Sequence, residues 1–318
     1  MDVIPSACPN CGSCDLIQNR AERDIENEIA FRSQFVKRRL DHKPDPAELM
    51  DLTSFMHGGP GCLLTCETCG LTVRREPQQA TYATDIYDHD LLTHLYPRYL
   101  NPFREKARQC ESYLPAHADV IEVGSHLGAF LQAAGEQNWN ATGLDIGESS
   151  SAFARHRGLC VKRKEITDAP FPKHSMDAIF IWNCFEQLEN PAATLRAAHG
   201  LLKRHGVLVV RTPNFEFYEA QRSRRRALAY NNLLGFPYLM GYTPALLASF
   251  VRRHGFHPVA GFDSTVVTMP FPDVSSRNQT DFEQVNAPYQ YSRPKAPGAL
   301  QGPWIEILYR RRDQADVL

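Results

Sequence analysis

The sequence predicts an α/β protein whose main domain is an open, doubly wound sheet, preceded by a small metal-binding module. From about residue 119 onward, short apolar runs alternate with helical segments, a pattern typical of parallel βαβ units. Six of the nine cysteines fall before residue 70. A chain of 318 residues has room for one large domain and one small one.

Seven segments read as strands and four as helices. The expected strands are 120–124, 141–146, 159–165, 177–183, 207–213, 257–264 and 304–311. The expected helices are 127–137, 150–158, 191–206 and 241–256.

Composition divides the chain into three regions. Residues 1–80 form a cysteine-rich, ribbon-like module with a helical insertion, 81–118 a helical cap or linker, and 119–318 the main domain. Within the last, residues 269–303 are rich in proline and polar side chains. Connections of that length are uncommon, and a substrate lid and a surface loop are equally good interpretations.

Two cysteine pairs of the form C-x-x-C-G predict a structural Zn²⁺ site. Cys8 and Cys11 form one pair, and Cys66 and Cys69 the other. Each pair can place two thiolates on one ion around a tight turn, so two pairs supply a tetrahedral Cys₄ set. Cys14 and Cys62 lie close enough to replace a ligand. Free buried cysteines and a redox pair are weaker alternatives, since neither pair opens a helix after a strand.

Charge and hydropathy give no sign of a protein that binds polyanions or membranes. The formal net charge of -1 gives no whole-chain signal for a polyanion or membrane-surface binder. The basic clusters at 37–39, 162–164 and 224–226 are short and read as solvated ends of elements. No apolar window approaches the roughly 20 residues of a membrane span, and no signal peptide is apparent. We therefore expect a cytoplasmic protein that does not engage a membrane.

The stretch VIEVGSHLGAFL predicts a ligand-binding turn between a strand and a helix. Gly124 permits the sharp turn, and Gly128 allows close packing of the helix that follows. The next expected strand ends in Asp145, 21 residues after Gly124, where a carboxylate can accept hydrogen bonds from a ribose. His126 stands where a dinucleotide-binding loop has its middle glycine, which disfavours a pyrophosphate ligand. Glu122 suits a ligand that carries positive charge.

In these motifs, residues 119–265 resemble the class I S-adenosylmethionine-dependent methyltransferases, in the branch that includes ubiquinone-type O-methyltransferases. The resemblance implies a Rossmann-like seven-stranded sheet with the last strand antiparallel. It also implies S-adenosylmethionine as cofactor, with Glu165, or alternatively Asp168, at the adenine amino group. The family often has Glu-His where this chain has Glu186-Gln187. The cofactor-binding residues implied are Glu122, Gly124, Ser125, His126, Gly128, Asp145, Ile146, Glu165, Ile166 and Asn183.

We therefore expect methyl transfer to oxygen or carbon of a small-molecule acceptor. Because the cofactor supplies the leaving group, the protein mainly has to align the acceptor with the methyl group, and no set of catalytic side chains is required. His126 and His57 are weak candidates for a general base, and a structural role is the better interpretation of each. Three alternatives stay open: an RNA methyltransferase whose zinc module docks on RNA, a non-catalytic binding protein with this fold, and, more remotely, a dehydrogenase. The acceptor, the atom methylated and the oligomeric state are left open at this stage.

Overall fold

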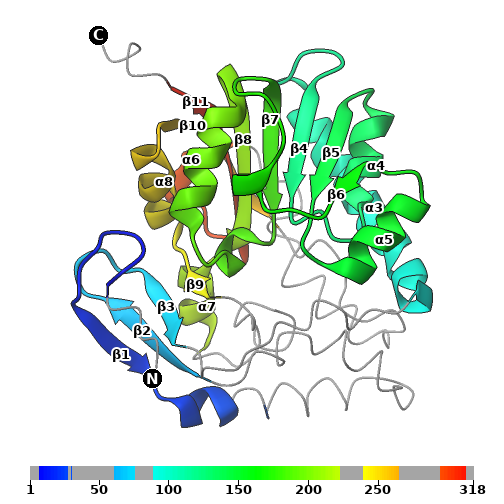
Figure 1. Ribbon diagram of the computed structural model, residues 1–318. Helices are drawn as coiled ribbons and strands as arrows, with labels where there is room; N and C mark the ends of the chain where they lie inside the picture. Colours follow the sequence, from blue (N-terminus) through cyan, green and yellow to red (C-terminus); the bar gives the residue numbers. More distant parts are fainter. Residues whose placement is uncertain are drawn as a thin grey trace.

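A computed structural model of the chain describes residues 7–27, 30, 61–75, 89–222, 239–264 and 294–312. Its centre is a seven-stranded sheet with the order β10-β11-β8-β7-β4-β5-β6 (Figure 1). All neighbouring strands run parallel except β11, which lies antiparallel between β8 and β10. The expected α/β sheet with an antiparallel last strand is confirmed. The strands are β4 Asp119–Val123, β5 Asn140–Leu144, β6 Val161–Lys162, β7 Met176–Trp182, β8 Leu202–Pro213, β10 Phe256–Ser264 and β11 Trp304–Arg311.

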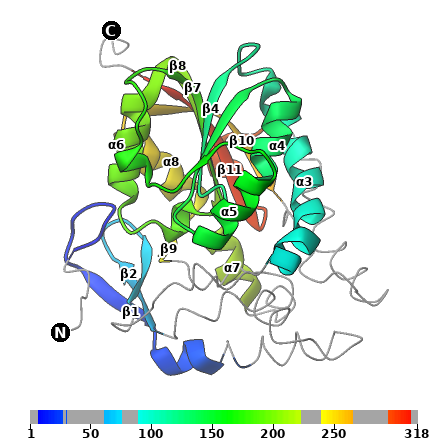
Figure 2. The same ribbon diagram turned by 45° about the vertical axis from the view of Figure 1, so that its right-hand side comes forward.

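Helices cover both faces of the sheet, as the two views of the ribbon show (Figures 1 and 2). One buried cluster joins the sheet to α6 and α8, and another joins it to α3 and α4. The fold is therefore doubly wound. The helices are α3 His89–Glu111, α4 Ala129–Glu136, α5 Glu148–His156, α6 Pro191–Leu201, α7 Phe215–Arg222 and α8 Pro244–Arg253.

Local sequence explains where the helices of one face begin. Asn190 caps α6 by accepting a hydrogen bond from the Ala193 N–H at 3.0 Å, and Thr243 caps α8 by accepting from Leu246 at 3.3 Å. A proline follows each cap, where its missing N–H costs nothing. The central strand β7 is apolar on both faces, as expected of a strand covered on both sides.

The largest differences from the predicted boundaries occur in one helix and one strand. The helix expected over 191–206 ends at Leu201, because the buried Leu202 already has extended backbone and begins β8. The strand expected over 159–165 shrinks to Val161–Lys162. This strand lies at the edge of the sheet, where only β5 offers it a partner.

A second, four-stranded sheet carries the cysteine pairs, at the lower left of Figure 1. Its order is β1-β2-β3-β9, and all neighbours are antiparallel. Its fourth strand follows β8 in the chain, so this sheet is completed by a segment of the larger domain. The strands are β1 Leu16–Arg20, β2 Cys62–Cys66, β3 Thr72–Arg75 and β9 Met240–Gly241.

Side chains reinforce this junction. Arg20 of β1 pairs with Glu219 of α7 at 2.6 Å. Leu64 and Val73 belong to the same buried cluster as the apolar residues of α6 and α8. A division of the chain near residue 80 stays a prediction, but the described ribbon packs as one body with the large sheet.

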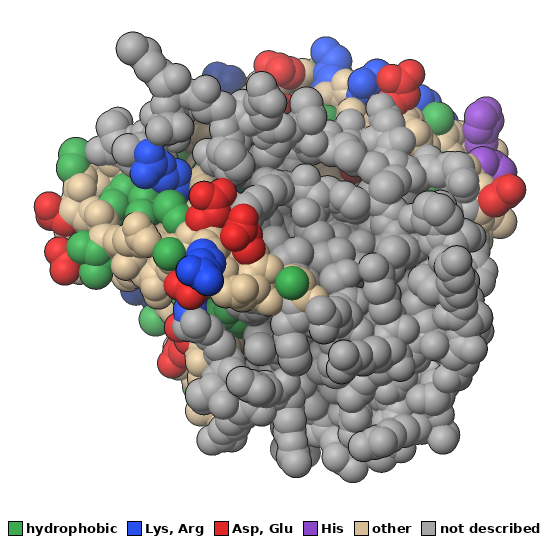
Figure 3. Space-filling model, turned by 90° about the horizontal axis from the view of Figure 1, so that it is seen from below, with side chains coloured by type: hydrophobic (Ala, Val, Ile, Leu, Met, Phe, Trp, Pro, Cys, Tyr) green, Lys and Arg blue, Asp and Glu red, His purple; other side chains and the backbone are tan. Residues whose placement is uncertain are grey.

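Seen from below, the described side chains of this end include apolar, acidic and basic groups side by side (Figure 3). His57, the basic clusters at 37–39 and 224–226, and most of the 269–303 connection lie outside the described residues. In the ranges that the structure covers, no helix combines the length and the apolar character that a membrane span requires.

Candidate functional site

A cavity of about 730 Å³ lies at the carboxyl ends of β4, β5, β7 and β8. The chain leaves β4 toward β5 on one side, while β7 pairs with β4 on the other. This is a topological switch point, where open α/β sheets bind ligands. The fold alone therefore places the site at the loop that the sequence singled out.

The loop after β4 needs its two glycines. Gly124 has φ 70°, and a Cβ there would lie 2.7 Å from the Cys184 sulfur. Gly128 has φ 77°, and a Cβ there would lie 2.6 Å from Leu159 Cδ1. Both positions combine a left-handed backbone with a close approach, so any other residue is strained. The predicted roles of sharp turn and close packing match this geometry.

Glu122, one residue before the end of β4, places a buried carboxyl group on the cavity wall. Its Oε2 atom has no hydrogen-bond partner in the described part of the chain. Burial, and then the negative charge of Asp145, raise the pKa of Glu122 well above its ordinary value. Such a group needs either a proton or a cationic partner.

Hydrogen bonds to Asp145 connect the loop after β4 with the loop after β5. Its Oδ2 accepts a hydrogen bond from the His126 backbone N–H at 2.6 Å. Its Oδ1 accepts from the Gly147 N–H at 2.8 Å and from the Ser150 hydroxyl at 3.1 Å. A carboxylate has about four lone-pair sites, so Asp145 retains capacity for a ligand hydroxyl. The buried Ser125 lines the cavity beside it.

His126 lies in the same loop with φ 46°. Its ring packs edge-on against Tyr99, with 6.1 Å between centroids. Burial lowers the pKa of His126, although the charge of Asp145 opposes this. The imidazole is thus neutral at neutral pH, and its role as a general base stays a prediction.

The remaining cofactor candidates lie along the rim of the cavity. Ile146 is 56% exposed, which is unusual for a large apolar side chain, and it lines the cavity together with Glu165 and Ile166. Asp168, the alternative to Glu165, is exposed and lies outside the lining. The structure therefore favours Glu165 of the two carboxylates.

Asn183 lines the opposite wall, just after β7. Its backbone has φ 56°, and its side-chain oxygen accepts a hydrogen bond from Arg211. Gln187, in the 3-10 turn Phe185–Gln187, donates to the Asn183 carbonyl at 2.8 Å. The Cys184 thiol donates to the Val123 carbonyl at 3.1 Å, which ties this turn to β4.

Sequence reasoning missed several residues of this wall. Tyr99 and Phe103 come from α3, Arg211 from β8 and Trp304 from β11, and all four line the cavity together with Trp182. Of these residues, only Arg211 could have been recognised from the sequence, because it places a charge at the carboxyl end of an otherwise apolar strand, VLVVRTP.

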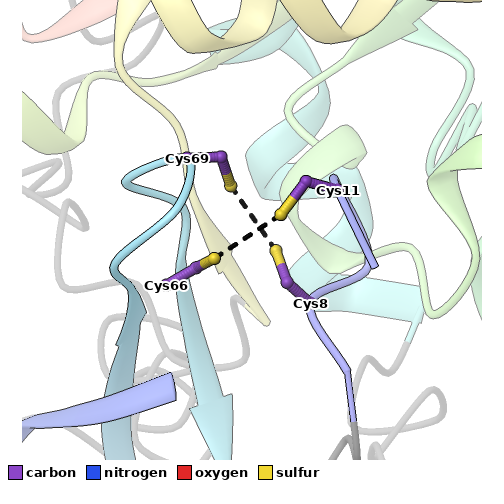
Figure 4. A group of neighbouring side chains, drawn as sticks. All are labelled: Cys8, Cys11, Cys66 and Cys69. Carbon is purple, nitrogen blue, oxygen red and sulfur yellow. Dashed lines mark hydrogen bonds between the residues drawn. The ribbon is translucent and has the colours of Figure 1, made fainter. Parts of the chain in front are cut away.

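The four predicted zinc ligands come together at the end of the small sheet (Figure 4). The sulfur atoms of Cys8, Cys11, Cys66 and Cys69 all lie within 4.8 Å of one another. Cys8 lies 3.5 Å from Cys69, and Cys11 lies 3.6 Å from Cys66. A tetrahedron of Zn–S bonds of about 2.3 Å requires sulfur separations of about 3.8 Å.

The two knuckles have the same backbone pattern. The Gly12 N–H donates to the Cys8 carbonyl and the Gly70 N–H to the Cys66 carbonyl, each at 2.8 Å. Burial raises the pKa of the Cys66 thiol, but hydrogen bonds from backbone N–H groups, including that of Cys69, and from the Cys11 and Cys69 thiols outweigh it and bring the pKa to about 7. Cys14 and Cys62 lie outside the cluster.

Comparison with known proteins decides the family. A family model described as a methyltransferase domain matches residues 87–260, more than half of the chain. The chain belongs to the methyltransferase domain family. The matched segment contains α3, the glycine loop, Asp145 and Arg211, so it includes all of the cavity lining except Trp304.

Curated relatives share part of this methyltransferase domain. A ubiquinone biosynthesis O-methyltransferase of Pseudomonas aeruginosa is 30% identical over 102 residues, which are 30% of this chain and 44% of the relative. A demethylmenaquinone methyltransferase of Tropheryma whipplei is 34% identical over 101 residues, 30% of this chain and 41% of the relative. The chain thus spans less than half the length of these relatives.

Among solved structures, a chain of the complex between a methyltransferase activator and a putative methyltransferase of Haloferax volcanii has the same fold. It superposes with a TM-score of 0.52 at 15% identity, covering 71% of this chain and 95% of the other. At this identity the likeness supports the fold of the methyltransferase domain alone.

Proposed function

We propose that the protein is an S-adenosylmethionine-dependent methyltransferase that methylates oxygen or carbon of a small-molecule acceptor. The observation that carries the proposal is one cavity lined by two chemically different sets of side chains. One set comprises acidic side chains and the glycine loop, and the other comprises aromatic side chains. A cofactor and an acceptor can therefore lie side by side, as direct transfer requires.

The acidic part of the lining fits S-adenosylmethionine. The Glu122 carboxylate, whose Oε2 has no partner among the described residues, suits the cationic amino group of the methionine part, and Asp145 has capacity for one ribose hydroxyl. The exposed Ile146 offers an apolar surface for adenine, with Glu165 beside it as an acceptor for the amino group. When bound, the cofactor supplies an activated methyl group and its own leaving group. The residues of this chain bind and orient the two reactants.

A small-molecule acceptor is supported by the site and by the relatives. The aromatic part of the lining consists of buried or half-buried side chains of α3, β7 and β11. The curated relatives are named for quinone methylation. The mixed charges on the described part of the lower face give no support to RNA docking (Figure 3). A cytoplasmic location stays a prediction.

We also propose that Cys8, Cys11, Cys66 and Cys69 hold a structural Zn²⁺ ion. Four thiolates leave no open coordination position, so the ion has no part in the transfer step. We expect one zinc per chain by elemental analysis of the purified protein, and loss of that zinc in Cys69→Ser. Cys14→Ser is the matched control, because Cys14 is exposed and lies outside the cluster. Full zinc content in Cys69→Ser would contradict the Cys₄ site.

The deciding experiment combines cofactor binding with a transfer assay. Calorimetry should show binding of S-adenosylhomocysteine. Methyl-labelled S-adenosylmethionine and an extract of the source cells, separated into RNA, protein and low-mass fractions, should give label in the low-mass fraction. RNase-sensitive label would instead make the ribbon an RNA-docking module. Failure to bind S-adenosylhomocysteine would favour a non-catalytic binding protein.

A further inference from the structure

We infer that Arg211 is a positioning residue: it orients the side-chain amide of Asn183 so that the Asn183 NH₂ group binds the carboxylate in the amino-acid part of the cofactor. The inference rests on the proposed function and adds a ligand group that the acidic side chains of the cavity cannot bind. Three observations carry it: the position of Asn183 next to the strand of Glu122, the hydrogen bonds of Asn183, and the donor character of Arg211.

Asn183 follows β7 at the end of the sheet where Glu122 lies. The strands β7 and β4 are parallel neighbours, and Ile181 pairs with Val123. The Cys184 thiol donates to the Val123 carbonyl at 3.1 Å, which holds the turn after β7 against β4. Glu122 and Asn183 both line the cavity. Adjacent strands thus bring an acidic side chain and an amide to the same cavity.

The hydrogen bonds of Asn183 leave one of its polar groups for a ligand. Its backbone N–H donates to the Arg211 carbonyl at 3.0 Å, and its carbonyl accepts from the Gln187 side chain at 2.8 Å. Its Oδ1 atom accepts from the Arg211 guanidinium. Within the described residues, only its NH₂ group has no partner, and the side chain is half-buried on the cavity wall. Asn183 therefore offers the cavity a donor.

Arg211 determines which half of the amide faces the cavity. The oxygen and the NH₂ group of an asparagine have nearly the same shape, but a guanidinium has donors only. A turned-over amide would place NH₂ against N–H. Arg211 is completely buried, with its guanidinium 4.3 Å from the centre of the Trp304 ring, so it is held in place. This role depends on donor character and needs no free charge, since Arg211 also acts on the buried Glu186, where it opposes the rise in pKa that burial causes.

An acceptor and a donor on adjacent strands match an α-amino acid group. Such a group carries an ammonium and a carboxylate on one carbon atom. The Oε2 atom of Glu122, which has no partner among the described residues, suits the ammonium. The carboxylate needs a donor, because the cavity lining also contains the carboxylates of Glu122 and Asp145, which repel it. The neutral NH₂ group of Asn183 supplies one.

The test compares two ligands that differ only in this carboxylate. They are S-adenosylhomocysteine and its decarboxylated analogue, which keeps the ammonium group. Calorimetry, with competition against S-adenosylhomocysteine for the weaker ligand, gives both dissociation constants. We expect the wild type to bind S-adenosylhomocysteine about tenfold to a hundredfold more tightly than the analogue, the value of a charge-assisted hydrogen bond.

Asn183→Asp is the main variant, because it keeps the shape of the side chain and an oxygen for Arg211. It replaces the NH₂ group with a second oxygen, which cannot donate and repels a carboxylate. The preference for S-adenosylhomocysteine should therefore fall at least about tenfold. The affinity for the analogue should not fall, since its ammonium group is still attracted.

Arg211→Met tests the positioning role. Without the guanidinium the Asn183 amide is free to turn over, so the preference should fall about threefold to tenfold. In an Asn183→Ala background the same change should have no further effect on the preference, because Arg211 acts through Asn183. A general disturbance of the cavity would persist in that background. Arg211→Lys, the milder variant, keeps a donor and should retain part of the preference.

Asn138→Asp is the matched control for the amide-to-acid change. Asn138 also has a left-handed backbone, with φ 60°, but its side chain is exposed and lies outside the cavity lining. The preference for S-adenosylhomocysteine should be the same in this variant as in the wild type.

The outcomes separate the two proposals. Equal affinities of the wild type for the two ligands, or a preference that persists in Asn183→Asp, would overturn the inference and leave the proposed function standing. An equal effect of Arg211→Met with and without Asn183 would overturn the positioning role. Failure of S-adenosylhomocysteine to bind the wild type would overturn the proposed function, and the inference with it.

Discussion

At the residue scale, Glu122 is the most sensitive point of the site, because its buried oxygen has no partner among the described residues. We expect Glu122→Gln to weaken S-adenosylhomocysteine binding about tenfold to a hundredfold, the value of a charge-assisted hydrogen bond. Calorimetry of wild type and variant measures this. Glu165→Gln, on the exposed rim of the same cavity, should have the smaller effect.

The raised pKa of Glu122 gives the same binding reaction a pH dependence. As pH falls through that pKa the carboxyl group becomes protonated, so it loses its attraction for the ligand's cationic amino group. The affinity of the wild type should therefore decline as pH falls through that pKa, and binding at a pH where Glu122 is protonated should release a proton to the buffer. Glu122→Gln should remove the Glu122 part of both effects; an identical pH profile in the variant would contradict the assignment.

Gly124 offers a test of backbone geometry. Gly124→Ala should destabilise the fold by about 2–4 kcal/mol, since a left-handed φ and a contact of 2.7 Å with the Cys184 sulfur act together. The double variant with Cys184→Ala should recover the part due to the contact and retain the part due to φ. Urea unfolding of the three proteins separates the two contributions. Equal stability of the single and double variants would rule out the steric part.

The sequence predicted these residues and missed Arg211 for a physical reason. Glu122, Gly124 and Asp145 lie within one strand–turn–helix–strand unit, where spacing along the chain fixes spacing in the fold. The partnership of Arg211 with Trp304 depends on the pairing of β8 with β11, which are separated by a long stretch of chain. Local sequence patterns do not specify the register between these two strands.

At the scale of elements, the short strand β9 could not be predicted from the sequence. Met240 and Gly241 precede the proline that opens α8, and Gly241 fell within the helix expected over 241–256. They form a strand because β3 is available as a partner: Thr72 pairs with Gly241 and Val73 with Met240. The longer strands and helices were predicted because their apolar periodicity is local.

The turn that follows β7 contacts the residue before β9 through Glu186. Its backbone carbonyl accepts from the Leu239 N–H at 2.8 Å, and its side chain accepts from the Thr212 hydroxyl at 2.9 Å. Burial raises the pKa of Glu186 to about 7. The folded state therefore favours the protonated form, so this group's contribution to stability is present below an unfolded pKa of about 4.5 and declines as pH rises to about 7.

Glu186→Gln should remove this pH dependence. Relative to wild type, the variant should gain stability steadily between about pH 4.5 and 7, and the difference should level off above that range. Urea unfolding at several pH values measures the difference. Asp168→Asn, an exposed carboxylate in another turn, is the control and should show no such trend. A constant difference for Glu186→Gln across the range would contradict the raised pKa.

At the scale of the whole molecule, the cysteine cluster and the cavity are joined by continuous structure. The knuckle at Cys66 and Cys69 leads into β3, and the Arg74 N–H of β3 donates to the Leu239 carbonyl at 2.8 Å. Leu239 in turn donates to Glu186, which neighbours Gln187 on the cavity wall. Disorder of the ribbon therefore removes backbone hydrogen bonds next to the cavity wall at Gln187.

Removal of zinc should thus affect more than the ribbon. Metal binding contributes folding free energy directly, because the four-cysteine site exists only when the two knuckles are folded together. We expect a chelator strong enough to strip zinc to lower the midpoint of a single thermal transition by several degrees, because the ribbon and the large sheet share one buried cluster. Scanning calorimetry of Cys11→Ser should match the chelated wild type, and Cys14→Ser should match the untreated one. Two separate transitions, with the chelator leaving the midpoint of the later one unchanged, would contradict this prediction. They would show that the ribbon unfolds independently and that the pairing of β3 with β9 does not couple its unfolding to that of the large sheet.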